Sequence, residues 1–125
     1  MLTDERIEYG KANMEYSLEA DVVHEHDDCI RMAYEWLDAQ KKIKNPTAKI
    51  QPLKHIIEKW AGRYISTSDV EVAAFLHPEI HGTYPYFNIS ARLTQPSDSR
   101  LDGISEALTQ DYRESFDKSF YSVCE

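Results

Sequence analysis

The feature that most constrains the fold is a run of apolar residues at nearly the helical period between Ala20 and Lys44. Because residues three to four positions apart share one face of a helix, this run predicts a long amphipathic helix. Its apolar positions are Val22, Val23, Cys29, Ile30, Ala33, Trp36, Leu37 and Ile43. Acidic residues crowd the start of the run and lysines its end, which suits the helix dipole at both ends. Asn45-Pro46 then ends the helix.

Shorter helices are predicted on both sides of this run. Thr3 can cap a first helix, in which Gly10 weakens the helix or marks a bend. Pro52 suits the first position of another helix, and Gly62 is the left-handed residue expected at its end.

The C-terminal half contains further helices and one ambiguous segment. Residues 68–71 (Ser-Asp-Val-Glu) form a capping box that opens a helix, and His77-Pro78 ends it. Residues 82–93 alternate like a strand from Phe87 onward, but Asn88 could also cap a short helix, which is the interpretation we favour. After a turn and cap at residues 96–99, a last helix is predicted to run to about Leu108, which faces inward, and an aromatic arm follows.

Length and composition place these elements in one fold class. The chain has 125 residues, with 4 Gly and 5 Pro, which is typical of one domain over residues 1–125 rather than of a turn-rich all-β fold. We therefore expect an all-α or α-dominated fold. In it, one long helix supports several short helices, with or without a small hairpin or winged-helix-like part.

Cysteine usage and the N-terminal sequence indicate a cytoplasmic protein. The chain has 2 cysteines, fewer than a disulfide-stapled secreted domain of this size carries. Cys29 is predicted to be a core thiol, and Cys124 to lie in a frayed tail. The N-terminus lacks the basic and apolar regions of a signal peptide. No apolar run approaches the roughly 20 residues of a membrane span, so we expect no membrane contact.

The net charge of −8 is unevenly distributed along the chain. Residues 1–38 carry −8, residues 39–63 carry +6 and residues 64–125 carry −6. The sequence therefore describes an acidic protein with a basic belt. Uncompensated charge of this size opposes the compact state by self-repulsion, which suggests a use beyond solubility.

Two stretches resemble a known class of proteins. Residues 29–40 (CIRMAYEWLDAQ) and 54–62 (KHIIEKWAG) are similar to small accessory proteins of tailed bacteriophages and prophages. Such proteins share no activity, so the resemblance implies no catalytic or binding residue. It implies only that the chain binds and modulates a host macromolecule.

The densest group of candidate metal ligands lies at residues 24–29 (His-Glu-His-Asp-Asp-Cys). On a helix, His24 and Asp28 would share one face, and His26 and Cys29 another. A zinc site needs three or four convergent ligands, and this spacing fits no established motif. The sequence also lacks a glycine-rich phosphate loop and a nucleophile elbow. We expect no metal, no cofactor and no enzymatic activity, and a metal-dependent enzyme is the third interpretation.

DNA binding is the main alternative function. Residues 53–93 could form a winged-helix or helix-turn-helix module, with residues 68–76 as the supporting helix and residues 88–93 as the reading helix. The basic residues that would then contact nucleic acid are Lys54, Lys59, Arg63 and Arg92. Because the reading helix offers one cation and the flanking blocks are acidic, the charge pattern favours this function less.

The sequence favours a non-enzymatic protein that binds another protein. A surface rich in Asp and Glu can steer onto basic grooves, including those evolved for nucleic acid. Aromatic residues beside a proline supply rigid anchors. We therefore predict a small regulatory or inhibitory protein that binds a host protein with a basic, nucleic-acid-handling surface. The predicted contacts are Glu25, Asp27, Asp28, Tyr84 and Tyr86.

Overall fold

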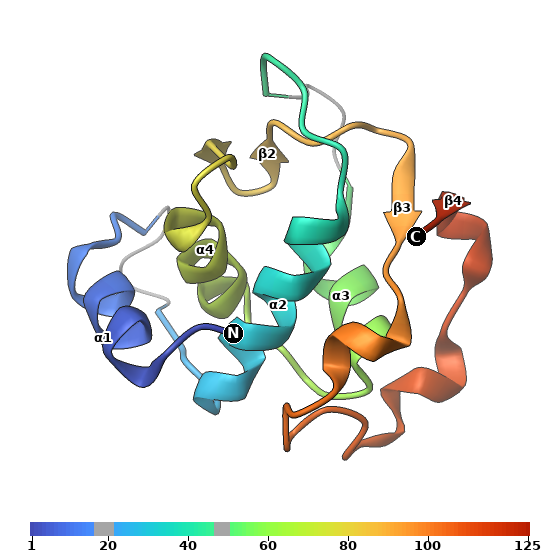
Figure 1. Ribbon diagram of the computed structural model, residues 1–125, viewed down its shortest axis with the longest axis horizontal. Helices are drawn as coiled ribbons and strands as arrows, with labels where there is room; N and C mark the ends of the chain where they lie inside the picture. The colour runs from blue at the N-terminus through green and yellow to red at the C-terminus, as the bar shows by residue number, and fades with distance from the viewer. Residues whose placement is uncertain (17–21, 47–50) are drawn as a thin grey trace.

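The computed structural model describes residues 1–16, 22–46 and 51–125 and is dominated by helices (Figure 1). The α-helices are α1 (Asp4–Asn13), α2 (Asp27–Ala39), α3 (Leu53–Ala61) and α4 (Thr67–Leu76). The short strands are β1 (Gly82–Thr83), β2 (Tyr86–Phe87), β3 (Leu93–Gln95) and β4 (Tyr121–Cys124). The 3₁₀ helices are η2 (Asp98–Leu101), η3 (Asp111–Ser115) and η4 (Lys118–Phe120). In the described part of the chain, no helix has the length and apolarity that a membrane crossing requires.

The core is built around α2, which lies between α4 and α3 (Figure 1). Trp36 on α2 and Trp60 on α3 are both fully buried. Cys29 is also fully buried, so the predicted core thiol is confirmed. The apolar faces of the helices meet in one cluster, which β2, β3 and η2 extend with Phe87, Leu93 and Leu101.

The predicted long helix is wrong, because α2 begins only at Asp27 and ends at Ala39. Ala20 and Asp21 lie outside the described residues. Ahead of α2, the backbone of Val23 binds the start of α4 instead of forming helical bonds. Its N–H donates to Ser68 Oγ (3.1 Å), and its carbonyl accepts from Ser66 Oγ (2.6 Å). A backbone group bonded to a distant segment cannot join the helical ladder, which explains the late start.

The other end of α2 is set by a second long-range contact. After Gln40 the chain becomes extended and pairs with residues 88–90, through Ile43 N to Asn88 O (2.9 Å) and Ser90 N to Lys41 O (2.9 Å). The helix therefore ends at the residue before Gln40 rather than at Asn45-Pro46.

Helix α1 packs closely against α4 through Gly10. Thr3 caps α1 as predicted, and its hydroxyl accepts from Arg6 N (3.2 Å). A Cβ placed on Gly10 would lie 2.8 Å from Val72 Cγ1 and 3.1 Å from Leu76 Cδ1. Gly10 therefore allows the two helices to approach, which goes beyond the predicted weakening or bend.

The ends of α3 and α4 follow the predictions with small corrections. Gly62 adopts a left-handed conformation with φ +68° after α3, as predicted. Pro52 is the residue before the first helical position rather than that position itself. The capping box of α4 is formed by Ser66 and Asp69, not by Ser68 and Glu71, which are both buried.

Residues 82–93 do not form the helix that we favoured. Strands β1 and β2 make an antiparallel hairpin with Gly82 opposite Phe87. Asn88 does not cap a helix, because its buried side chain is used elsewhere. Its Nδ2 donates to Ile43 O (3.2 Å) and Glu79 O (2.9 Å), and its Oδ1 accepts from His81 N (2.7 Å). The predicted reading helix at residues 88–93 is therefore absent.

The C-terminal segment differs from the helix predicted between the turn at residues 96–99 and Leu108. The short 3₁₀ helix η2 is followed by turns, and Leu108 has φ +61° and is 53% exposed instead of facing inward. Cys124 is not in a frayed tail, because β4 pairs with β3 in parallel and Cys124 lies opposite Gln95. Glu125 anchors the end of the chain by an ion pair with Arg100.

Candidate functional site

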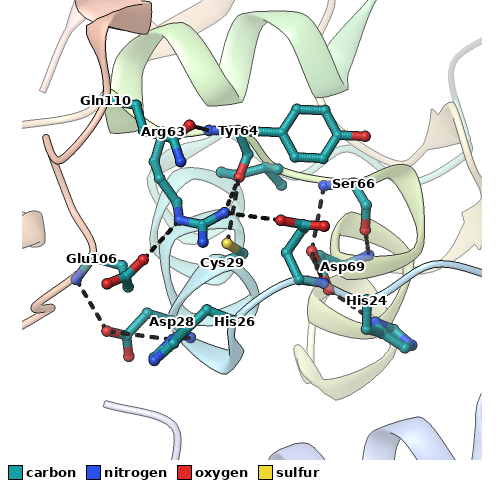
Figure 2. A network of polar contacts seen from close by, with 12 residues as sticks. His24, His26, Asp28, Cys29, Arg63, Tyr64, Ser66, Asp69, Glu106 and Gln110 are labelled. Carbon is teal, nitrogen blue, oxygen red and sulfur yellow. Dashed lines mark hydrogen bonds and ion pairs between the residues drawn. The ribbon is translucent and has the colours of Figure 1, made fainter.

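The predicted acidic contact Glu25 forms an ion pair with Arg63, whose further contacts to Glu106 and Tyr64 are drawn in Figure 2. Arg63 lies at its centre, with Nη1 3.3 Å from Glu25 Oε1 and Nε 3.0 Å from Glu106 Oε1. The same guanidinium donates to Tyr64 O at 2.9 Å, and Arg63 is only 9% exposed. Glu25 therefore balances a buried cation, and Arg63 is not placed on the surface as a phosphate contact requires.

The neighbouring carboxylates are also balanced within the protein. Asp27 pairs with Lys11 at 2.7 Å. Asp28 is buried and accepts from Arg31 (2.8 Å) and Ser105 (2.9 Å). Burial opposes the ionised form of Asp28, but these hydrogen bonds outweigh it and hold the pKa of that carboxyl below its usual range. Asp28 is thus a structural carboxylate, and its side chain is not exposed as the predicted contact with a partner would require.

His24 does not meet Asp28, because residues 22–26 are not helical. Its Nδ1 lies 2.8 Å from the fully buried Asp69 Oδ1, and its Nε2 lies 2.7 Å from the Tyr16 hydroxyl. Burial, with the charges of Glu71 and Asp69, raises the pKa of Tyr16. A phenol with a raised pKa keeps its proton at neutral pH, which is the opposite of an activated nucleophile. This chain of contacts therefore fastens residues 22–26 to α4.

The other predicted metal ligands are equally dispersed. His26 caps α2 by accepting from Asp28 N at 3.0 Å. Burial raises the pKa of the Cys29 thiol to about 12, and its Sγ lies 3.4 Å from Tyr64 O. Within residues 1–16, 22–46 and 51–125, no three His, Cys, Asp or Glu side chains are grouped so that they could hold a metal ion.

The basic residues of the DNA-binding alternative do not form one free surface. Lys54 pairs with Glu58 at 2.9 Å and lies over the Tyr64 ring. Lys59 is half-buried on α3, and Arg92 is exposed just before β3. Neither has an ion-pair partner in the described part of the chain. With Arg63 buried and the reading helix absent, the winged-helix interpretation loses its main structural elements.

A cavity of about 290 Å³ opens on the described surface. Its lining residues come from the segment just after α1, from the middle and end of α4, and from the β1–β2 hairpin with the residues before it. In Figure 1, α1, α4 and this hairpin lie on the side of the molecule away from β4. Its aromatic and aliphatic walls come from Met14, Phe75, Ile80, Tyr84 and Phe87, and its ionisable side chains from Glu15, Glu71 and His81. We call this cavity the α1–α4 pocket.

The hairpin that closes the pocket is fixed in place by its backbone and by Tyr84. Gly82 has φ +105°, and a Cβ there would lie 2.3 Å from Tyr86 O, so a larger residue cannot replace it in this turn. The Tyr84 hydroxyl accepts from Lys54 N at 3.2 Å, and its ring meets that of Phe87 edge-on with centroids 6.0 Å apart. Tyr84 is thus half-buried in the pocket wall, while Tyr86 is 38% exposed on the same hairpin.

Exposed aromatic rings continue from the pocket onto the outer surface of α1 and α4. Phe75 is 43% exposed and stacks on Tyr9, which is 59% exposed, with ring centroids 6.3 Å apart. Because Phe75 also lines the pocket, the pocket and this ring pair form one continuous surface. Large apolar rings in contact with solvent beside a concavity mark a binding surface.

Sequence reasoning identified only part of this site. It selected Tyr84 but missed Tyr9, Glu15, Glu71 and Phe75. Helix α4 is apolar on nearly all sides, so its sequence gives no outward face, and Phe75 could not be separated from its buried neighbours. The nearness of residues 14–15 to the hairpin depends on how α1 packs, and the local sequence does not encode it.

Neither a protein-family model, nor a curated protein, nor a solved structure matches this chain.

Proposed function

We propose that this protein is a small, non-enzymatic regulatory or inhibitory protein that binds a host protein with a basic, nucleic-acid-handling surface. We place the contact at the α1–α4 pocket and the Tyr9–Phe75 ring pair, and not at residues 25–28. The observation that carries the proposal is the continuity of exposed rings with a carboxylate-lined cavity.

The ring pair supplies the apolar part of such an interface. Binding energy in protein complexes is concentrated in a few aromatic residues that become fully desolvated. Tyr9 and Phe75 keep about half of their surface in water in the free protein, so a partner can still bury it. Tyr84 and Tyr86 on the adjoining hairpin extend the aromatic surface, and both remain proposed contacts.

The charge of the protein suits a basic partner. The net charge is −8. Of the exposed carboxylates, Glu15 lines the pocket and Glu79 directly precedes the lining residue Ile80, while Glu5 and Glu8 lie on α1. Long-range attraction from such a surface mainly raises the association rate and the specificity. Proteins that handle nucleic acid present the complementary positive surface.

The proposal is tested by capture from a bacterial lysate with matched surface variants. Wild type, the double variant Tyr9→Ala/Phe75→Ala and the control Phe120→Ala are immobilised, and bound proteins are identified by mass spectrometry with and without nuclease treatment. Phe120 is a matched control because it is 40% exposed and belongs to η4, which contributes no residue to the lining of the α1–α4 pocket. We expect a basic protein captured by wild type and by Phe120→Ala but not by the double variant.

The purified partner then gives the magnitude. Loss of two anchor rings is expected to weaken binding at least tenfold, since one hot-spot residue contributes about 2 kcal/mol or more and 1.4 kcal/mol is tenfold. Equal binding by the double variant and wild type would remove this surface from the interface. Capture that nuclease abolishes would instead point to nucleic acid.

A further inference from the structure

We propose that the α1–α4 pocket is a binding site for one cationic side chain, arginine or lysine, presented by the partner protein. This inference rests on the proposed function and adds the chemical class of the group that enters the pocket. It is argued from the charges, the rings and the size of the cavity.

The ionisable wall of the pocket favours a cation. Glu15 and Glu71 both line it, and Glu71 is only 4% exposed. Among the described residues that line the pocket, none is Lys or Arg, and His81 is the one basic side chain beside these two acidic ones. The partial negative charge at the C-terminal end of α1 adds to this field, because Met14 and Glu15 directly follow that helix. An anionic ligand would be repelled by the same groups.

The carboxylate field is felt by a neighbouring group. Burial first, and after it the charges of Glu71 and Asp69, raise the pKa of Tyr16, the residue that follows Glu15. A positively charged group that enters beside Glu71 would be attracted by the same negative charges.

The rings supply the second half of the recognition. Phe75, Tyr84 and Phe87 line the cavity, and the face of an aromatic ring attracts a cation within about 6 Å of its centroid. This attraction is stronger when water is excluded, as it would be in a closed pocket. Aliphatic neighbours such as Met14 and Ile80 would pack against the methylene stem of the same side chain.

The size of the cavity limits what can bind. Its volume of about 290 Å³ is at the lower end of the roughly 300–1,000 Å³ that holds small-molecule ligands. It therefore suits one side chain better than a dinucleotide-sized cofactor. Metal binding would need a third ligand group, and no such cluster exists among the described residues.

The test uses amino-acid probes with matched shape and different charge. N-acetyl-arginine amide, N-acetyl-lysine amide and N-acetyl-citrulline amide are titrated into the full chain while amide shifts are followed by NMR. Citrulline replaces the guanidinium with a neutral group of the same outline. We expect the arginine or lysine probe to bind with a dissociation constant in the millimolar range and to shift amide signals around Phe75 and Tyr84. The citrulline probe is expected to bind at least tenfold more weakly. Citrulline binding as tightly as arginine would overturn the proposal.

Variants separate the contributions of charge and rings. Phe75→Leu keeps an apolar side chain but removes the ring, and is expected to weaken arginine binding about threefold to tenfold. Glu15→Gln removes an exposed charge, with an expected loss of about twofold to fivefold that disappears at high salt. Glu71→Gln should cause the largest loss of affinity for the arginine probe. Because Glu71 is buried, circular dichroism is used to check that the Glu71→Gln variant still folds. If that variant unfolds, Glu15→Gln still tests the role of the charge.

The two proposals can fail separately. If the captured partner needs Tyr9 and Phe75 but ignores Glu15→Gln and Glu71→Gln, the proposed function stands and the cationic pocket is wrong. If the arginine probe binds but the Tyr9→Ala/Phe75→Ala variant still captures the partner, the interface lies elsewhere and the pocket's preference for cations is retained. Spermidine binding more tightly than the arginine probe would assign the pocket to a free polyamine and overturn its assignment to a partner side chain.

Discussion

Replacing Gly10 with alanine sets two opposing effects against each other at the α1–α4 contact. Alanine favours the helix by about 1 kcal/mol relative to glycine. The added Cβ, however, would lie 2.8 Å from Val72 Cγ1, well inside the roughly 3.5–4.0 Å at which carbon atoms pack. Val72 is fully buried and β-branched, so it has little room or rotamer freedom to move aside.

The magnitudes predict that packing outweighs helix propensity. Inserting a methyl group into a well-packed core costs about 1–3 kcal/mol. We therefore expect Gly10→Ala to lower the free energy of unfolding by about 1 kcal/mol, measured by urea denaturation followed through circular dichroism and tryptophan fluorescence. Because Met14 and Glu15, which directly follow α1, line the pocket, the same variant is expected to weaken binding of the arginine probe.

A double-mutant cycle identifies the cause. Val72→Ala removes the side chain that the new methyl group meets, so Gly10→Ala should be neutral or stabilising in that background. We expect a coupling energy of about 1 kcal/mol, above the roughly 0.5 kcal/mol within which independent sites add. If Gly10→Ala stabilises the wild-type chain by its full helix propensity and the cycle is additive, the close contact between α1 and α4 is refuted.

Three further predictions follow from buried groups. Trp36→Ala should lower the free energy of unfolding by about 3–5 kcal/mol in urea, and a loss below about 1 kcal/mol would place Trp36 on the surface. Asp28→Asn should destabilise by about 2–3 kcal/mol at pH 7, because Arg31 loses its buried partner. Since the folded pKa of Asp28 is lowered, its contribution is present above about pH 4 and lost as pH falls through the folded value, so melts of wild type and variant should converge in acid. A thiol reagent should modify the exposed Cys124 quickly and the buried Cys29 only in urea, and rapid labelling of both would mean that α2 opens readily.

The sequence alone determined the features that depend on neighbouring residues. Thr3 caps α1 and Gly62 ends α3 because a hydroxyl acceptor and a left-handed residue act within one helical turn. The helical period around Cys29 and Trp36 likewise predicted the buried face of α2 correctly. The predominance of helices followed from the same local patterns.

Tertiary contacts decided where the elements end. The helical pattern continues through Val22 and Val23, but the buried carboxylate of Asp69 accepts from Glu25 N and organises residues 22–26 as a strap over α4. Asn88 looked like a cap locally, yet its side chain joins three distant backbone groups and fixes the hairpin instead. A buried backbone group must find a partner, and a distant one overrides the local pattern.

The site was the least predictable part, for the same reason. Residues 25–28 form a dense acidic run in the sequence, but Lys11 and Arg63 from distant segments, and Arg31 one turn further along α2, balance those charges in the fold. The pocket brings together the end of α1, the middle of α4 and a hairpin, none of which carries a binding motif. Composition and periodicity act along the chain, whereas a cavity is a property of side chains that only packing places side by side.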